Sequence, residues 1–305
     1  KGSFLVAHYD HGGYMTSLMV YRGCGECNTI NDFSCFHPCE TAELTQFSWD
    51  EVGRLQEAKK LPGTCNETEC TFAENPSAHY QHTYDSSNVR TVKKEVLKDT
   101  YDLYLSGSFE IRGAALTPSE SFEGGENTKY ISLFGNRIAR LAEESIWLTG
   151  ADSYFLFYLS NHLGSTSIVV KSDYGDVIEG RADMPYGAPD ASVLNSDPKY
   201  VEFNALYTYT GKEEDTDIDL FYFGERYLIS MLGRWISPDP LLSKNVGSLN
   251  AYGYVHNNPI NLIDPTGLQE QETGLPTCYL NENFLQQSAP ECYYETIPTS
   301  EASTT

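Results

Sequence analysis

The strongest constraint on the fold is a short segment that recurs three times in the first 90 residues. Each copy has an aromatic residue followed by Asp, then a turn with Gly or Asn, then a second strand-like stretch. The copies are Tyr9-Asp10-His11-Gly12-Gly13-Tyr14, Trp49-Asp50-Glu51-Val52-Gly53-Arg54-Leu55 and Tyr84-Asp85-Ser86-Ser87-Asn88-Val89-Arg90. Asp can accept a hydrogen bond from a backbone amide two residues further on, and Gly or Asn tolerates the positive φ of a turn. Each copy predicts a β-hairpin, and because one hairpin cannot bury its own face, the hairpins must stack into a continuous sheet.

Strand-like patterning continues through most of the chain, where aromatic and β-branched residues alternate with polar ones. The clearest stretches are Tyr154–Leu159, Ser167–Lys171, Tyr207–Thr210 and Phe221–Phe223. Only residues 130–145 could form an amphipathic helix, and the turn signal Phe134–Arg137 inside them argues against it. The pattern therefore predicts an all-β protein.

The charge of the chain excludes one class of partner. Lys and Arg number 20 against 43 Asp and Glu, which gives a net charge of −23. Affinity for nucleic acid rests on basic residues that displace counterions, so no nucleic-acid partner is expected. No apolar run approaches the roughly 18 residues that a membrane span needs, so no membrane-spanning segment is expected.

The eight cysteines indicate an oxidising compartment. They form three local groups: Cys24, Cys27, Cys35 and Cys39; Cys65 and Cys70; Cys278 and Cys292. An even number in tight clusters predicts disulfides and a secreted or cell-surface location. The first group could instead hold zinc, because closely spaced thiolates suit tetrahedral coordination, but the other pairs have no metal partners and favour disulfides. The pairing among the first four stays open, and residues 23–40 are expected to form a stapled surface loop inserted between two hairpins.

Asn66 begins an N-glycosylation sequon inside the loop between Cys65 and Cys70. Such a site functions only on a surface loop in a eukaryotic secretory pathway, and the triplet is common by chance. It is a weak candidate for modification.

Seven motifs follow one another between His162 and Leu268. They are His162-Leu163-Gly164-Ser165; Met184-Pro185-Tyr186-Gly187; Tyr209-Thr210-Gly211-Lys212-Glu213; Phe221-Tyr222-Phe223-Gly224-Glu225-Arg226-Tyr227; Leu232-Gly233-Arg234-Trp235-Ile236-Ser237-Pro238-Asp239-Pro240; Leu249-Asn250-Ala251-Tyr252-Gly253-Tyr254-Val255; and Asn257-Asn258-Pro259-Ile260-Asn261-Leu262-Ile263-Asp264-Pro265-Thr266-Gly267-Leu268. In this order they resemble the Rhs repeat-associated core domain, and the three hairpin segments resemble the YD repeats of Rhs proteins. The resemblance covers about 250 of the 305 residues and leaves out the cysteine insert and the tail.

The resemblance implies a fold and a domain organisation. Rhs proteins form a spiral of stacked antiparallel β-hairpins that closes into a hollow shell, with the core domain as a plug at one end. Residues 1–150 would then be YD-repeat hairpins, residues 151–268 the Rhs core, and residues 269–305 an acidic tail. Similar proteins include polymorphic bacterial toxins, the C components of insecticidal toxin complexes, wall-associated proteins and teneurins.

The main candidates for chemistry are Asp239 and Asp264, each followed by Pro and 25 residues apart. Two carboxylates brought close cannot both ionise easily, so one can act as a base and the other as an acid. In the Rhs family these positions resemble a self-cleaving aspartic site, which would cut between Leu268 and Gln269. Many cleaving members have Arg directly before the first Asp, where this chain has Pro238, and Arg234 is the candidate substitute. The alternative is that both Asp residues only form turns, since Asp-Pro is a turn dipeptide.

The remaining motifs give weaker evidence for a functional site. His8 with His11, and His79 with His82, are three residues apart on strand-like stretches, where such residues point to opposite faces, so metal binding is not expected. Thr210-Gly211-Lys212 resembles the end of a P-loop but lacks the Gly five residues before Gly211, so phosphate binding by that motif is not expected.

The tail after Leu268 has six Glu and no Lys, Arg or His, and its 37 residues are too few for an enzyme with its own core. The leading hypothesis is an extracellular Rhs-type shell scaffold for packaging, adhesion or surface interaction, which cuts itself at most once and needs no cofactor. Its partners would be its own C-terminal segment, the rest of the shell, or a cell-surface protein or glycan. The alternatives are a secreted toxin whose core encloses and releases a C-terminal effector, and a carbohydrate- or cell-binding module.

Overall fold

The structure is a computed structural model, and it describes residues 2–24, 39–66, 69–133, 136–142, 154–172, 175–194, 205–241 and 250–272. Almost every regular element in these ranges is a β-strand, which confirms the predicted all-β class. No helix in the described ranges is long and apolar enough to cross a membrane. The stretch 130–145, which the sequence left open to a helix, contributes to two strands, β11 and β12.

One antiparallel sheet of 16 strands occupies the chain up to Leu194. Its strands are β1 (Gly2–Tyr9), β2 (Met15–Cys24), β3 (Thr41–Trp49), β4 (Leu55–Cys65), β5 (Cys70–Phe72), β6 (Ala78–Tyr84), β7 (Arg90–Glu95), β8 (Thr100–Ser106), β9 (Phe109–Leu116), β10 (Phe122–Glu123), β11 (Glu126–Leu133), β12 (Asn136–Ala142), β13 (Tyr154–Ser160), β14 (Thr166–Lys171), β15 (Val177–Asp183) and β16 (Pro189–Leu194). The strands pair in chain order, with β5 and β10 as side branches on β4 and β9. The stacking of hairpins into one sheet, predicted from the repeats, is confirmed.

Six hairpin turns in this sheet share one backbone scheme. In each, the amide of the first residue donates to the carbonyl four residues later, and its own carbonyl accepts from the amide three residues later. The residue in that fourth position has a positive φ, which favours Gly and Asn. The turns begin at Asp10, Asp50, Asp85, Thr117, Asn161 and Met184. The sequence repeats predicted the first three, and the structure adds the other three.

Most of these turns also use the side chain of their first residue. Oδ1 of Asp10 accepts from the amides of Gly12 at 2.8 Å and Tyr14 at 2.9 Å. Oδ1 of Asn161 accepts in the same way from Leu163 and Ser165, at 2.9 and 3.1 Å. Asn161 therefore begins a further hairpin turn of the repeat type, and strand β13, which precedes it, pairs with β12 in the same sheet.

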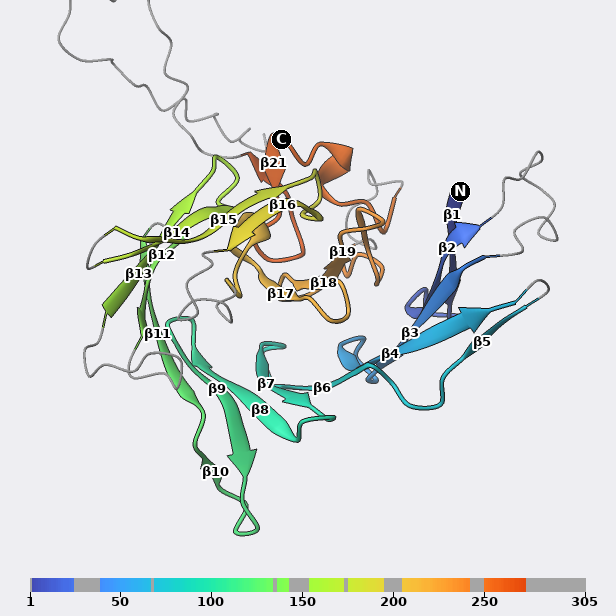
Figure 1. The fold of residues 1–305 in the computed structure, drawn as a ribbon, viewed down its shortest axis with the longest axis horizontal. Helices are drawn as coiled ribbons and strands as arrows, with labels where there is room; N and C mark the ends of the chain where they lie inside the picture. Colours follow the sequence, from blue (N-terminus) through green and yellow to red (C-terminus); the bar gives the residue numbers. More distant parts are fainter. Residues whose placement is uncertain are drawn as a thin grey trace, which may run out of the picture.

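The described residues between 205 and 272, here called the plug, fold into short elements. These are η2 (Tyr209–Gly211), β17 (Glu213–Asp215), β18 (Leu220–Tyr222), β19 (Tyr227–Ile229), β20 (Arg234–Trp235), η3 (Val255–Asn257), β21 (Leu262–Ile263) and β22 (Gln271–Glu272). Strands β17 to β20 form a four-stranded sheet, and β21 pairs with β22. Figure 1 shows the large sheet, from β1 to β16, curving around the plug.

Apolar side chains join the plug to the inner face of the sheet. Leu18 and Leu55 of the first hairpins form one buried cluster with Leu220 and Ile229 of the plug. At the other end of the sheet, Leu156, Val169 and Ile178 enclose Ala205. Each fully buried side chain of this size contributes about 1.5–3 kcal/mol. The sheet and the plug therefore share a core, and the plug is held in a fixed position.

Two disulfides are present among the described cysteines. Cys24 bonds to Cys39, which closes the base of the expected surface loop, and Cys65 bonds to Cys70 across paired strands β4 and β5. The first bond uses two of the four thiolates that a zinc site would need. Cys27, Cys35, Cys278 and Cys292 lie outside the described residues, as does Thr68 of the sequon, while Asn66 is exposed.

Candidate functional site

Asp239 and Asp264 line the same cavity, although 25 residues separate them. The cavity has a volume of about 210 Å³, and Arg226, Trp235, His256 and Glu270 also line it. The plug supplies every one of these residues. The two carboxylates that the sequence nominated are thus brought together.

Arg226 is the cation that faces both carboxylates. Its Nη1 lies 3.7 Å from Oδ2 of Asp239, and its Nη2 lies 3.6 Å from Oδ2 of Asp264. Its guanidinium stacks on the ring of Trp235, with 4.4 Å between the carbon of the guanidinium and the ring centroid. Burial lowers the pKa of Arg226 below its ordinary value, and the charges of Asp239 and Asp264 only partly offset that effect.

Asp264 is buried and tied to the segment that follows it. Its Oδ1 accepts hydrogen bonds from the amides of Thr266, Gly267 and Leu268, at 3.1, 2.8 and 3.1 Å. Burial raises the pKa of Asp264 above its ordinary value, because the amide hydrogen bonds and Arg226 only partly compensate for the loss of water. Asp264 is therefore the carboxyl that retains a proton more readily than a carboxyl in water.

Asp239 is less enclosed than Asp264, with side-chain exposures of 13% and 4%. Its Oδ1 accepts from the amide of Leu241 at 2.7 Å. In both residues, then, one oxygen forms a turn and the other faces Arg226. Both Asp residues therefore do form turns, as the alternative interpretation expected. Each turn uses only one carboxylate oxygen, and the other oxygen faces the cavity.

The bond nominated for cleavage, between Leu268 and Gln269, directly follows this turn. The amide of Leu268 is held by Asp264, and Nε of Arg226 donates to the carbonyl of Gly267. Beyond the bond, Glu270 lines the same cavity and pairs with the exposed His256 at 2.6 Å. The residues on both sides of this bond are thus fixed next to the carboxylate pair.

Arg234, nominated from the sequence as the supporting cation, lies elsewhere. Its guanidinium donates to Oδ1 of Asn257, and it forms no ion pair with Asp239 or Asp264 in the described structure. Arg226 takes the place expected of Arg234. Sequence reasoning missed it because it lies within a strand-like aromatic motif, where a buried cation has no local signature.

Three of the histidines named in the sequence, His79, His82 and His162, have structural partners. His79 pairs with Glu57 at 2.7 Å, and the buried His82 donates to the carbonyl of Leu55 at 3.2 Å. His162 lies in the Asn161 turn and contacts the carbonyl of Ile260 at 2.8 Å. In the described ranges, no cluster of His, Cys, Asp or Glu is suited to a metal ion.

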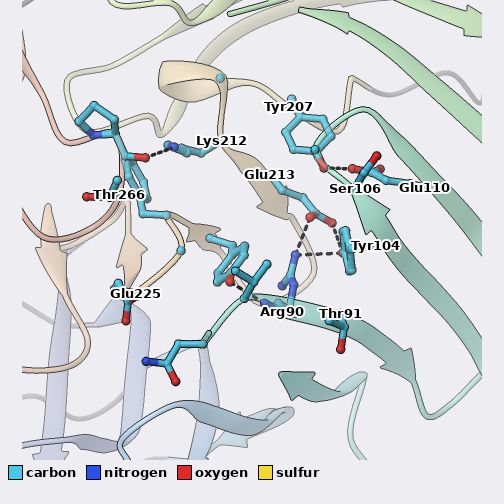
Figure 2. Close-up of a pocket in the computed structure, with 18 of the residues that line it drawn as sticks. Arg90, Thr91, Tyr104, Ser106, Glu110, Tyr207, Lys212, Glu213, Glu225 and Thr266 are labelled. Carbon is cyan, nitrogen blue, oxygen red and sulfur yellow. Dashed lines mark hydrogen bonds and ion pairs between the residues drawn. The ribbon is translucent and has the colours of Figure 1, made fainter. Parts of the chain in front are cut away.

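A second polar cluster joins the plug to the sheet. Glu213 of β17 accepts from Arg90 at 2.5 Å, from Lys93 at 2.9 Å and from Arg112 at 2.8 Å. Figure 2 shows Arg90 and Tyr104 converging on this carboxylate. Burial alone would raise the pKa of Glu213, but the three cations outweigh it and hold the pKa well below the ordinary range. The cluster fixes which part of the sheet the plug contacts.

Comparison with known proteins shows similarity to bacterial toxin subunits. Toxin subunit YenC1 of Yersinia entomophaga is 34% identical over 118 residues, which are 39% of this chain and 12% of that protein. Toxin subunit YenC2 of the same organism is 47% identical over 106 residues, 34% of this chain and 10% of that protein. The crystal structure of TcdB2-TccC3 shares the fold, with a TM-score of 0.57 and 19% identity over 87% of this chain and 14% of that one.

The chain is related to the Rhs-repeat C components of toxin complexes. This confirms the Rhs resemblance carried by the seven motifs. No protein-family model matches the chain. The matched stretches cover about a tenth of the two toxin subunits, so this chain corresponds to a small part of their length.

Proposed function

We propose that this chain is the closing part of an Rhs-type β-shell, which packages a polypeptide segment and cuts itself once between Leu268 and Gln269. The relationship to toxin subunits supports a shell role, and the sheet curved around a plug supports packaging. The observation that carries the cleavage proposal is Arg226, which contacts both Asp239 and Asp264 and donates to Gly267. A secreted location is part of the proposal, because the disulfides require an oxidising compartment.

The proposed reaction is a single hydrolysis. Asp239, the more exposed carboxylate, takes a proton from water, whose oxygen attacks the carbonyl carbon of Leu268. Asp264, the carboxyl with the raised pKa, donates its proton to the nitrogen of Gln269 as the peptide bond breaks. The fixed charge of Arg226 stabilises the negative charge that develops between the two carboxyl groups.

The test is the intact mass of the purified full chain and its variants. Wild type should yield two fragments that separate between Leu268 and Gln269, whereas Asp239→Asn, Asp264→Asn and Arg226→Met should remain uncut. Asp219→Asn is the matched control, because Asp219 belongs to the plug but pairs with Lys60 outside the cavity. A single uncut mass for folded wild type would contradict cleavage.

Packaging has a separate readout. If the shell retains its segment, the two fragments of the cut protein should elute together in native size-exclusion chromatography and separate in denaturant. Elution of the C-terminal fragment alone under native conditions would contradict packaging while leaving cleavage intact.

A further inference from the structure

A larger cavity also borders the Asp264–Leu268 segment. It has a volume of about 570 Å³ and lies between the inner face of the sheet and the plug (Figure 2). Asp264 lines the smaller cavity, while Pro265, Thr266 and Leu268 line the larger one. The same short segment thus forms a wall of both cavities.

Two cations in the lining of this larger cavity have no carboxylate partner. Nζ of Lys212 donates to the carbonyl of Pro265 at 2.5 Å. The guanidinium of Arg137 stacks on Tyr207, 3.4 Å from the ring centroid, and its Nη1 donates to the carbonyl of Gly211 at 3.3 Å. Within the described part of the chain, neither cation forms an ion pair, and the buried Nε of Arg137 has no hydrogen-bond partner.

Partly buried cations without an ion pair are unusual in a chain with 43 acidic residues. The acidic residues of the cavity wall are mostly engaged elsewhere. Glu213 binds Arg90, Lys93 and Arg112, and Glu110 binds Arg112 and Tyr207. Asp85 accepts the amides of its own turn. Glu225 is the remaining acidic residue of the lining, and its charge opposes the binding of a further anion.

We propose that Lys212 and Arg137 form a carboxylate-binding site in this cavity. The ammonium and the guanidinium would bind the two oxygens, and the apolar side chains of Val89, Leu105 and Phe223 would contact the rest of the ligand. The site does not use P-loop geometry, in which backbone amides surround a phosphate.

Two sources of carboxylate fit the site. One is a free organic carboxylate. The other is Leu268 itself, and this source rests on the cleavage proposed above. Hydrolysis adds the oxygen of water to the carbonyl carbon of Leu268, breaks its bond to the nitrogen of Gln269 and transfers a proton to that nitrogen. Leu268 then ends in a carboxylate while its side chain already lines the cavity.

The experiment uses N-acetyl-leucine, which combines a leucine side chain with a carboxylate. Its binding to the uncut full chain is measured by calorimetry, with Asp239→Asn as the uncut protein if wild type cuts itself. Saturable binding is expected, and Lys212→Met and Arg137→Met should each weaken it about ten-fold or more, because each removes a charged hydrogen bond. Arg137→Lys should retain part of the affinity, and Glu225→Gln should increase it.

Two controls separate the site from general effects. Lys94→Met removes a lysine that pairs with Asp99 outside the cavity, so it should not change binding. N-acetyl-leucine amide has the same side chain without the charge and should not bind. Circular dichroism identifies any variant that fails to fold, and Arg137→Lys then replaces Arg137→Met.

The outcomes are distinct. No saturable binding to the folded, uncut chain, or equal binding of the amide, would overturn the proposal. If the site exists, weaker binding to cut protein than to uncut protein assigns the site to the Leu268 carboxylate, and equal binding assigns it to free carboxylates. Cleavage is read by mass and binding by calorimetry, so the failure of one proposal is not mistaken for the failure of the other.

Discussion

Arg90 on β7 donates to Glu213 on β17 at 2.5 Å, and both side chains are almost completely buried, at 0% and 2% exposure. The two residues are 123 positions apart, so this contact joins the sheet to the plug. A buried ion pair adds little net stability compared with apolar packing, but the loss of one partner leaves a buried charge without compensation. The contact therefore specifies how the plug sits and makes the fold intolerant of changes at either residue.

Glu213→Gln should destabilise the protein by about 3–5 kcal/mol, because Arg90, Lys93 and Arg112 would all lose a carboxylate. The free energy of unfolding in urea measures this loss. Asp99→Asn is the control, since Asp99 pairs with Lys94 on the surface and its side chain is 75% exposed. That change should stay within about 0.5 kcal/mol. Similar losses for both variants would contradict the role given to the buried cluster.

His82 makes the fold sensitive to acid. Burial, with a smaller effect of the nearby Arg90, lowers the pKa of His82 from 6.5 to about 3. Between these values the unfolded chain binds a proton that the folded chain does not, so stability falls as the pH decreases below about 6.5. Between pH 6.5 and 5 this loss is about 2 kcal/mol.

His82→Phe should remove that part of the acid sensitivity. The ring contact with Tyr227 can persist, and the carbonyl of Leu55 retains its hydrogen bond from Tyr84 at 2.8 Å. Urea unfolding at pH 7 and pH 5 gives the comparison. An equal loss of stability in wild type and variant would show that other groups cause the acid sensitivity.

The Met184 turn lacks the side-chain hydrogen-bond acceptor that the other five hairpin turns possess. Its backbone hydrogen bonds match those of the Asp10 turn, and Met184 is 50% exposed. Met184→Asn should supply the missing acceptor and stabilise the protein by about 0.5–1 kcal/mol. Asp85→Ala, which removes the same acceptor from another turn, should destabilise it by a similar amount. A melting temperature for Met184→Asn at or below that of wild type would contradict this account of the turn.

The sequence predicted local features better than long-range ones. The aromatic-Asp turns were visible because the turn geometry depends on residues within five positions, and this information lies in the sequence. The turns that begin at Thr117 and Met184 were missed because they share the backbone hydrogen bonds of the Asp turns but begin with a different type of residue. The pairing of Asp239 with Asp264 was available only through the family resemblance. The contact of Arg226 with both carboxylates could not be predicted, because it arises when the residue just before β19 packs against the segments that carry the two Asp residues.

The burial of Lys212 next to Arg137 can be tested through the stability of the protein at alkaline pH. Burial, together with the charge of Arg137, lowers the pKa of Lys212 from 10.5 to about 8, although Asp264 acts in the opposite direction. Between these two values the unfolded chain binds a proton that the folded chain does not, so this lysine makes stability rise as the pH increases above about 8. Other groups titrate in the same range, among them the many tyrosines, so the informative quantity is the difference between wild type and Lys212→Met.

The free energy of unfolding of wild type should rise relative to that of Lys212→Met between pH 8 and about 10. Urea unfolding at intervals of one pH unit measures this difference. Lys94→Met serves as the reference, because its hydrogen bond to Asp99 raises the pKa of Lys94 and gives no such rise in this window. A pH-independent difference for Lys212→Met would mean that Lys212 keeps its charge in the folded protein. The ammonium would then be compensated by an anion at the site proposed for it, or by water.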